Sequence, residues 1–172
     1  LVLFTLYGCI SHTIEKEMEK NIETEDGDNN EAGKDIFIID NKQFNISANK
    51  TDAKATTDSI NAAIKKAKAE GFEKITLTKG EYLISSKGND RWSYPKDGIF
   101  VPSNTILDLT EAILELEPNN NEIYNMIIID HAQNVTIIGG HLKGDRDVHP
   151  TEENKSHEWG FGIRIISSQN IT

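Results

Sequence analysis

The chain has little of several residue types that would mark particular classes of protein. It has one cysteine in 172 residues, so a framework of internal disulfides is excluded. The apolar run that opens the chain is far shorter than the roughly 20 residues of a membrane-spanning helix. Lysine and arginine number 18 against 28 aspartates and glutamates, a net charge of −10. That balance argues against nucleic acid as a partner, because phosphate contacts need clustered basic residues.

What the chain does have is typical of a β-rich, turn-rich protein. Hydrophobic residues make up 37%, and glycine, asparagine, threonine and isoleucine are prominent. The length suffices for one domain with a core. The sequence starts inside an apolar run and stops within an expected strand at 168–172. Because an unpaired strand edge invites aggregation, we expect a fragment that is open at both ends.

The first nine residues, "LVLFTLYGC", are typical of the remainder of a secretory signal segment. Their last four residues resemble the lipobox of bacterial lipoproteins, in which the cysteine receives the lipid. The resemblance predicts lipidation of Cys9, a lipid anchor in the membrane, and a secreted or cell-surface bacterial lipoprotein. An ordinary signal remnant with an incidental cysteine is the alternative.

The next stretch, residues 10–43, is rich in acidic residues, asparagine and lysine and has no sustained apolar face. Such a composition cannot bury enough surface to fold alone, which predicts a disordered acidic linker. The predicted organisation is therefore a signal and lipobox remnant at 1–9, the linker at 10–43, and a folded domain at 44–172.

One helix is predicted early in that domain, over Thr57–Glu70, within "TTDSINAAIKKAKAEG". Thr57 or Asp58 is the expected N-cap, and Gly71 stands where a left-handed C-terminal cap belongs. Small apolar residues recur at helical spacing between the two ends, so the helix is expected to lie flat against another element.

An internal repeat follows the helix and predicts the architecture. "NMIIIDHAQNVTI" aligns with "FGIRIISSQNIT", which pairs Asn134 with Asn170, a separation of 170 − 134 = 36. "DGIFVPSNTILDL" is a third copy with a shorter turn, and its Asn104 precedes Asn134 by 134 − 104 = 30. Short strands with variable turns are expected of a solenoid. The asparagines are predicted to stack and to hydrogen-bond along its axis, in preference to serving as glycosylation sites.

Four segments, "TTDSINAAIKKA", "ITLTKGEYLI", "SNTILDLTEAILEL" and "NVTIIGGHLKGD", resemble the pectate lyase superfamily, and most of all the N-terminal part of polygalacturonase-type glycoside hydrolases. The resemblance implies an all-β fold: a right-handed parallel β-helix, capped at its N-terminal end by the helix and truncated at its C-terminus. It implies a carbohydrate-active enzyme that hydrolyses an acidic, pectin-like polysaccharide. A polysaccharide lyase or epimerase on the same fold is one alternative, and a non-catalytic glycan-binding surface protein is another.

The catalytic motifs of polygalacturonases are absent from this sequence. Those motifs are Asn-Thr-Asp, a later Asp-Asp pair, Gly-His-Gly and Arg-Ile-Lys. No catalytic residue is therefore assigned, and the catalytic coils are expected beyond Thr172. No metal site is predicted, because the ligand spacings of zinc sites do not occur. No cofactor is expected, with calcium considered only for a lyase, and the oligomeric state is left open.

Three polar loops, at 85–96, 118–124 and 145–160, each precede a strand of the repeat and should leave the same edge of the solenoid. Sugars are bound by flat apolar faces together with polar groups, and arginine suits a uronate carboxylate. Loops that merely pin themselves to the solenoid are the alternative. The predicted substrate-binding residues are Arg91, Trp92, Tyr94, Tyr124, Asp145, Arg146, Asp147, His149, His157, Glu158 and Trp159.

Two further interpretations concern single side chains of the repeat. If the segment after Gly144 is extended, Asp145 and Asp147 point the same way and form a carboxylate pair of the kind that glycoside hydrolysis uses. Solvated carboxylates, or a pairing with Arg146, are the favoured alternative. His131 and His141 are interpreted as structural residues.

Overall fold

A computed structural model describes residues 36–85, 97–121, 123–148 and 159–172. The predicted lipid anchor at Cys9 lies outside these ranges. Within them the chain forms short strands and one helix, α2 (Ala53–Ala69). The strands are β1 (Phe37–Ile39), β2 (Lys74–Leu77), β3 (Gly80–Ile84), β4 (Ile99–Phe100), β5 (Thr105–Asp108), β6 (Ala112–Leu116), β7 (Ile123–Asp130), β8 (Gln133–Ile138), β9 (His141–Lys143), β10 (Trp159–Ile166) and β11 (Gln169–Ile171).

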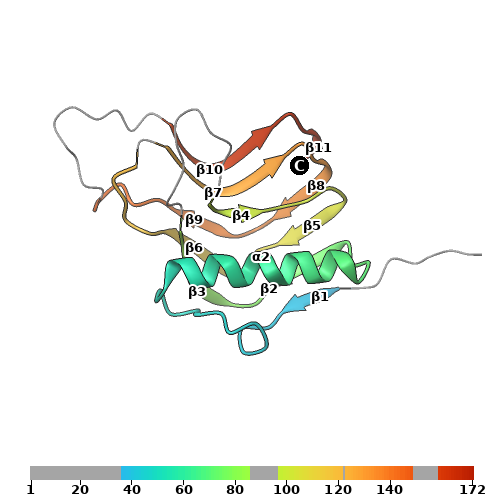
Figure 1. Ribbon diagram of the computed structural model, residues 1–172, viewed down its shortest axis with the longest axis horizontal. Coiled ribbons are helices and arrows are strands. Elements are labelled where there is room, and N and C mark those ends of the chain that lie inside the picture. The colour runs from blue at the N-terminus through green and yellow to red at the C-terminus, as the bar shows by residue number, and fades with distance from the viewer. Residues whose placement is uncertain (1–35, 86–96, 122, 149–158) are drawn as a thin grey trace, which may run out of the picture. The chain divides into compact units, whose positions relative to one another are not determined.

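The strands form three sheets, and every strand pairing is parallel. The sheet orders are β1-β2-β5-β8-β11, β10-β7-β4 and β3-β6-β9. From β2 onward, consecutive strands therefore visit the three sheets in turn: β5 pairs with β2, β6 with β3, and β7 with β4 (Figure 1). The prediction of a β-rich protein is confirmed, with sheets that are parallel throughout the described residues.

The strand register confirms the repeat that the sequence predicts. Ile127 pairs with Ile163 and Gln133 with Gln169, and both separations are 36. In the earlier copy, Ile99 pairs with Ile127, a separation of 127 − 99 = 28, whereas Thr105 pairs with Val135, a separation of 135 − 105 = 30. The turn between the two strands is thus two residues shorter in the first copy. Length changes are confined to turns, and the paired strands keep their alternation of inward and outward side chains.

The core is built from the inward-facing side chains of all three sheets and from one face of α2. In β6 the burial alternates along the strand, with Ala112, Leu114 and Leu116 buried. Tyr82 of β3 is also fully buried, and its hydroxyl donates to the Thr78 carbonyl oxygen at 2.7 Å, so its polar end is satisfied. The helix contributes Ile60, Ala63, Ile64 and Ala67, which are the apolar residues predicted at helical spacing.

The domain begins earlier than the sequence predicts. The acidic linker was expected to run to residue 43, but Phe37 and Ile39 are buried within β1. The strand pairs in parallel with β2, and the Phe37 ring lies 5.2 Å from the Phe72 ring, centroid to centroid. A three-residue strand has too few residues to show a clear alternation in the sequence, so β1 is recognised only by its pairing with β2.

The helix also begins earlier than predicted, at Ala53. Its N-cap is Asp52, whose carboxylate accepts the Ala55 N–H at 3.0 Å. Thr57, one of the two predicted caps, lies inside the helix instead, where its buried hydroxyl accepts the Ser85 N–H at 2.9 Å. The error arose because Asp52 and Thr57 both carry side chains that can cap a helix, and only the contact with Ser85 distinguishes Thr57 from the true cap. Gly71 does take the predicted left-handed conformation, with φ of 83°.

The helix and the segment before it also pair with the free sides of the first strands. Asn61 of α2 donates its side-chain N–H to the Gly98 carbonyl oxygen at 2.8 Å and accepts the Phe100 N–H at 2.9 Å. Its amide thus takes the place of a neighbouring peptide group beside β4. Asn49 forms a parallel bridge with Glu81 of β3. These contacts satisfy backbone groups that would otherwise form an open sheet edge.

The predicted asparagine ladder is present. Asn134 donates a side-chain N–H to the Asn104 amide oxygen at 2.9 Å, and Asn170 donates to the Asn134 amide oxygen at 3.0 Å. All three residues have positive φ, between 54° and 58°. Asparagine is one of the few residues with a side chain that tolerates this conformation. The amides both permit the turn and join one coil to the next.

Replacing the middle asparagine tests the ladder. We expect Asn134→Ala to lower the free energy of unfolding in urea by about 1–2 kcal/mol, since two amide bonds are lost and alanine strains at positive φ. Asn134→Gly is the matched control, because it keeps the turn conformation and removes only the bonds. We expect it to cost about half as much. Equal stability of Asn134→Ala and the parent chain would contradict this role.

Candidate functional site

The outward face of the β3-β6-β9 sheet is lined by charged side chains in register. Glu81, Ile113 and His141 form one row across the sheet, and Leu83, Glu115 and Lys143 form the next. Alternation along a strand places both rows on the side opposite the core. We define the charged face as Lys50, Lys79, Glu81, Glu111, Glu115 and Lys143.

Lys50 joins two strands of this face. Its ammonium lies 2.6 Å from a carboxylate oxygen of Glu81 and 2.9 Å from one of Glu115. Lys143 of β9 approaches Glu115 at 3.3 Å, so the carboxylate of the central strand lies between two lysines. Lys50 itself has φ of 62°, a conformation that costs energy for a residue with a side chain. The chain adopts it at the point where the lysine reaches over the sheet.

The ion pairs shift the pKa values of the groups that make them. The pKa of Lys50 is raised, chiefly by its bonds to Glu115 and Glu81. The pKa of the Glu115 carboxyl is lowered, first by its bond to Lys50 and also by Lys143. Both groups are therefore held in their charged forms at neutral pH. Glu115 is only 21% exposed, less than Lys50 or Glu81, so its pairing is the least screened by solvent.

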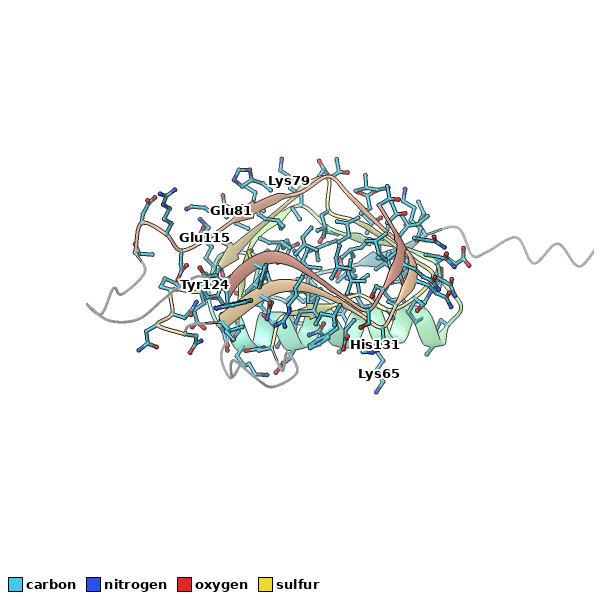
Figure 2. The ribbon with its side chains drawn as sticks, turned by 90° about the horizontal axis from the view of Figure 1, so that it is seen from above. Lys65, Lys79, Glu81, Glu115, Tyr124 and His131 are labelled. Carbon is cyan, nitrogen blue, oxygen red and sulfur yellow. The ribbon has the colours of Figure 1, made fainter. Side chains whose placement is uncertain are left out.

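A hollow of about 500 Å³ opens on this face. Lys79, Glu81 and Glu111 contribute polar groups to its wall, while Ile113 contributes an apolar surface. Gly80 lies at its base, where an added Cβ would come within 2.8 Å of the Ala48 Cβ. Figure 2 shows Lys79, Glu81 and Glu115 along one side of the sheet, with Tyr124 near the same end. The hollow thus presents both signs of charge beside an apolar patch.

The predicted substrate-binding residues are only partly described by the structure. Tyr124, Asp145, Arg146, Asp147 and Trp159 lie in the described ranges. Outside those ranges lie Arg91, Trp92, Tyr94, His149, His157 and Glu158. Asp145 follows β9, at the end of the sheet that carries the charged face. Tyr124 lies on β7 and Trp159 on β10, which are paired neighbours in another sheet.

Asp145 and Asp147 do not form an outward carboxylate pair. Residues 145–148 make a turn, closed by the Val148 N–H donating to the Asp145 carbonyl oxygen at 2.9 Å. Asp145 is buried and accepts the Asn119 N–H at 3.1 Å, whereas Asp147 is exposed. The condition for that pair, an extended segment, is not met, and the favoured solvated carboxylate describes Asp147 but not Asp145, whose buried carboxylate satisfies the backbone of the neighbouring coil. That contact is a structural role for Asp145.

Tyr124 and Trp159 sit differently on their strands. The Tyr124 ring covers Gly160 of the next strand, where an added Cβ would lie 2.0 Å from the ring. Burial, and next the charge of Asp145, raise the pKa of the Tyr124 hydroxyl. Trp159 is 44% exposed and pairs in register with Ile123. Trp159 lies on the edge strand of its sheet, on the same side of the sheet as the buried Ile123, and Tyr124 is largely used in packing.

Sequence reasoning missed the charged face itself. The signal was present in strands β3 and β6, where charged residues alternate with buried apolar ones. Nothing in that alternation places Lys50 beside them, since it precedes the helix in the chain. The two histidines were interpreted as structural. The Nδ1 atom of His131 lies 2.7 Å from an Asp130 carboxylate oxygen, a contact that fits a structural role. His141, in contrast, is exposed on the same outward row as Glu81.

The described residues contain one buried amide without a hydrogen-bond partner. Both polar side-chain atoms of Asn125, on β7, are fully buried and unpaired. Leaving such a group unsatisfied costs about 1–3 kcal/mol. Among the residues that the structure describes there is no group of three or more metal-ligating side chains. No helix in these same ranges is long and apolar enough to cross a membrane.

Two curated proteins of Bacillus subtilis (strain 168) are similar to this chain. It is 34% identical over 142 residues to the SPbeta prophage-derived uncharacterized protein YorA, and 32% identical over 142 residues to the uncharacterized protein YclG. Each alignment covers 78% of this chain and 24% of the relative. The chain thus spans about a quarter of the length of these relatives. No family model and no solved structure matches it.

Acidification tests the central ion pairs. Because the folded pKa of Glu115 is depressed, its contribution to stability is present above the unfolded value of about 4.3 and is lost as the pH falls through the folded pKa. We expect Glu115→Gln to lower the urea midpoint at pH 7 and to have little effect at about pH 3. Glu111→Gln is the control, because Glu111 lies on the same face and makes no ion pair within the described residues. An equal loss at both pH values would mean that the pairing does not contribute.

Proposed function

We propose that the described unit is part of a right-handed parallel β-helix, as the sequence resemblance implies. Three features support the proposal. The strands visit three parallel sheets in turn, an asparagine ladder joins equivalent turns, and a helix lies beside the first strands. The stacking direction is set by the parallel pairing, with about 4.8 Å between neighbouring strands. An experimental structure with left-handed connections between the sheets would overturn the proposal.

We infer further that the protein is carbohydrate-active and that its charged face binds an acidic, pectin-like polysaccharide. The observation that carries this inference is the hollow beside Lys50 and Lys79, on a sheet whose three strands pair in parallel and in register. A uronate polymer presents carboxylates and apolar ring faces in alternation. Lysine ammonium groups suit the first and Ile113 suits the second. The predicted loops follow strands of this same sheet, at its C-terminal edge.

Glycoside hydrolysis is the reaction that the sequence resemblance favours, and a lyase or epimerase reaction, with calcium in the lyase case, is the alternative on the same fold. The described residues favour a further candidate, a non-catalytic glycan-binding surface protein. Glu81 and Glu115 are both paired with Lys50, and Glu115 has a lowered pKa. A general acid for glycoside hydrolysis needs a raised pKa instead. These carboxylates hold Lys50 in place over the sheet, and we assign no catalytic residue.

Retention on immobilised polygalacturonate tests the binding face. We expect Lys79→Gln to weaken retention about threefold to tenfold, because one charge-assisted contact is lost from the hollow. Trp159→Ala should weaken retention similarly if its exposed ring contacts sugar. Lys65→Gln, on the helix, is the matched control and should bind as the parent chain does. Unchanged retention of both Lys79→Gln and Trp159→Ala, with unchanged thermal stability, would remove the charged face and Trp159 from the binding site.

Product analysis on the same polysaccharide, by new chain ends and by sugar composition, separates the candidates, since an epimerase would change the composition without cleaving the chain. New reducing ends without unsaturated sugars would indicate hydrolysis, and unsaturated ends would indicate a lyase. Retention without any product would leave the glycan-binding protein. A chain that neither binds nor cleaves the polymer would overturn the proposed function.

The proposed location is the bacterial cell surface, through a lipid on Cys9. The support is the placement of the only cysteine at the end of the opening apolar run. We expect Cys9→Ser to release the protein from the membrane fraction into the medium when the gene is expressed in a Gram-positive host. If Cys9→Ser still fractionates with membranes, the lipid anchor is wrong. A Ser11→Ala variant controls for changes to the leader that leave the cysteine in place.

A further inference from the structure

A second hollow, of about 520 Å³, lies between helix α2 and the outward face of strands β4 and β7. It is distinct from the charged face. Lys65 and Lys79 lie on different sides of the unit in Figure 2, and the two hollows share no lining residue. Its composition is also different, since the strands contribute mainly apolar side chains and the helix contributes lysines. We refer to it as the helix cleft.

The floor of the helix cleft is apolar. Ile127 and Ile129 of β7 belong to the contiguous core, so alternation along the strand points Ile128 to the other side of the sheet. Ile128 is nevertheless fully buried and lines the cleft. It pairs in register with Phe100, which is 38% exposed. Phe100 therefore offers an accessible apolar ring on the floor of the cleft.

Pro102 extends this floor beyond Phe100. Together the ring and the proline offer an accessible apolar surface, with few groups that suit the many hydroxyls of a sugar. Asn61, a polar residue of the wall, is already committed to the backbone at Gly98 and Phe100 through both its donor and its acceptor. The floor therefore favours a flat apolar body over a saccharide.

The rim of the helix cleft carries two cations. Lys65 and Lys68 are three residues apart on α2 and so lie on the same side of the helix. The Lys68 ammonium is 2.5 Å from the Asn104 carbonyl oxygen, which holds it at the turn that begins the asparagine ladder. Burial lowers its pKa. Asp130 stands at the far wall, where its carboxylate contacts His131 at 2.7 Å. The two ammonium groups thus outnumber the carboxylate, in a chain whose net charge is −10.

We propose that the helix cleft binds a small aromatic carboxylate. The aromatic ring of the ligand packs on Phe100 and Pro102, the exposed apolar residues of the floor, and its carboxylate lies between Lys65 and Lys68. Ring-to-ring contact with Phe100 supplies the preference for an aromatic body. The paired ammonium groups supply the preference for an anion and oppose a cationic ligand, since they outnumber the single carboxylate of Asp130 in the lining. This site does not depend on the proposed action on polysaccharide.

Phenylacetate is a suitable probe, and the full 172-residue chain with labelled isoleucine methyl groups is a suitable target for NMR titration. We expect the Ile64 and Ile128 methyl signals to shift, with a dissociation constant on the order of 1 mM for so small a ligand. Phenylacetamide, the neutral analogue, should bind at least about fivefold more weakly, and phenethylamine should not bind detectably. Equal binding of acid and amide, or tighter binding of the amine, would overturn the proposal.

Variants of the chain locate the site. Lys65→Gln should weaken phenylacetate binding about threefold, and Phe100→Leu, which removes the ring but keeps an apolar side chain, should weaken it about fivefold to tenfold. Lys79→Gln, on the charged face, should leave it unchanged, just as Lys65→Gln leaves polysaccharide retention unchanged. The amide spectrum of each variant checks that the chain is folded. Shifts that persist undiminished in Phe100→Leu, or an absence of shifts at roughly tenfold the expected dissociation constant, would show that the cleft is not the site.

Discussion

The structure depends on one constraint: each strand must pair in parallel and in register with its equivalent from the preceding repeat. A slip of one residue would turn every buried side chain outward. Asn104, Asn134 and Asn170 oppose such a slip because each holds a left-handed turn and bonds to the next. Gln133 and Gln169 add a second amide contact beside them, at 3.2 Å. The ladder therefore fixes where one sheet ends and the next begins.

Once the register is fixed, the two sides of each sheet serve different purposes. The inward side packs the core, which leaves outward positions available for charge or for apolar contact. On β3, β6 and β9 the outward positions carry carboxylates and lysines that pair across strands. On β4 and β7 they carry Phe100 and Ile128, which α2 partly covers. The different chemistry of the two hollows follows from which residues stand at these outward positions and from what covers them.

Sequence reasoning predicted the elements that depend on local pattern and missed the contacts that join distant segments. The repeat, the ladder and the C-terminal cap at Gly71 were confirmed, because each has a spacing or a residue type that only one conformation satisfies. The helix start was placed at Thr57 and is at Ala53, because Asp52 and Thr57 both carry capping side chains. The charged face was not predicted at all. Its central residue, Lys50, reaches Glu81 and Glu115 only after the chain has coiled.

The sequence by itself determined the periodicity, the β-rich class, the asparagine ladder and the left-handed cap at Gly71, since these follow from residue types at fixed separations. Only the tertiary structure decided which charged groups meet. The sequence favoured a solvated Asp145 or one paired with Arg146, whereas in the structure its buried carboxylate accepts the Asn119 N–H. Lys50 acquired its partners in the same way. Such pairings depend on the distance between coils, which no local pattern encodes. A buried charge is stable only where that distance brings a partner within reach.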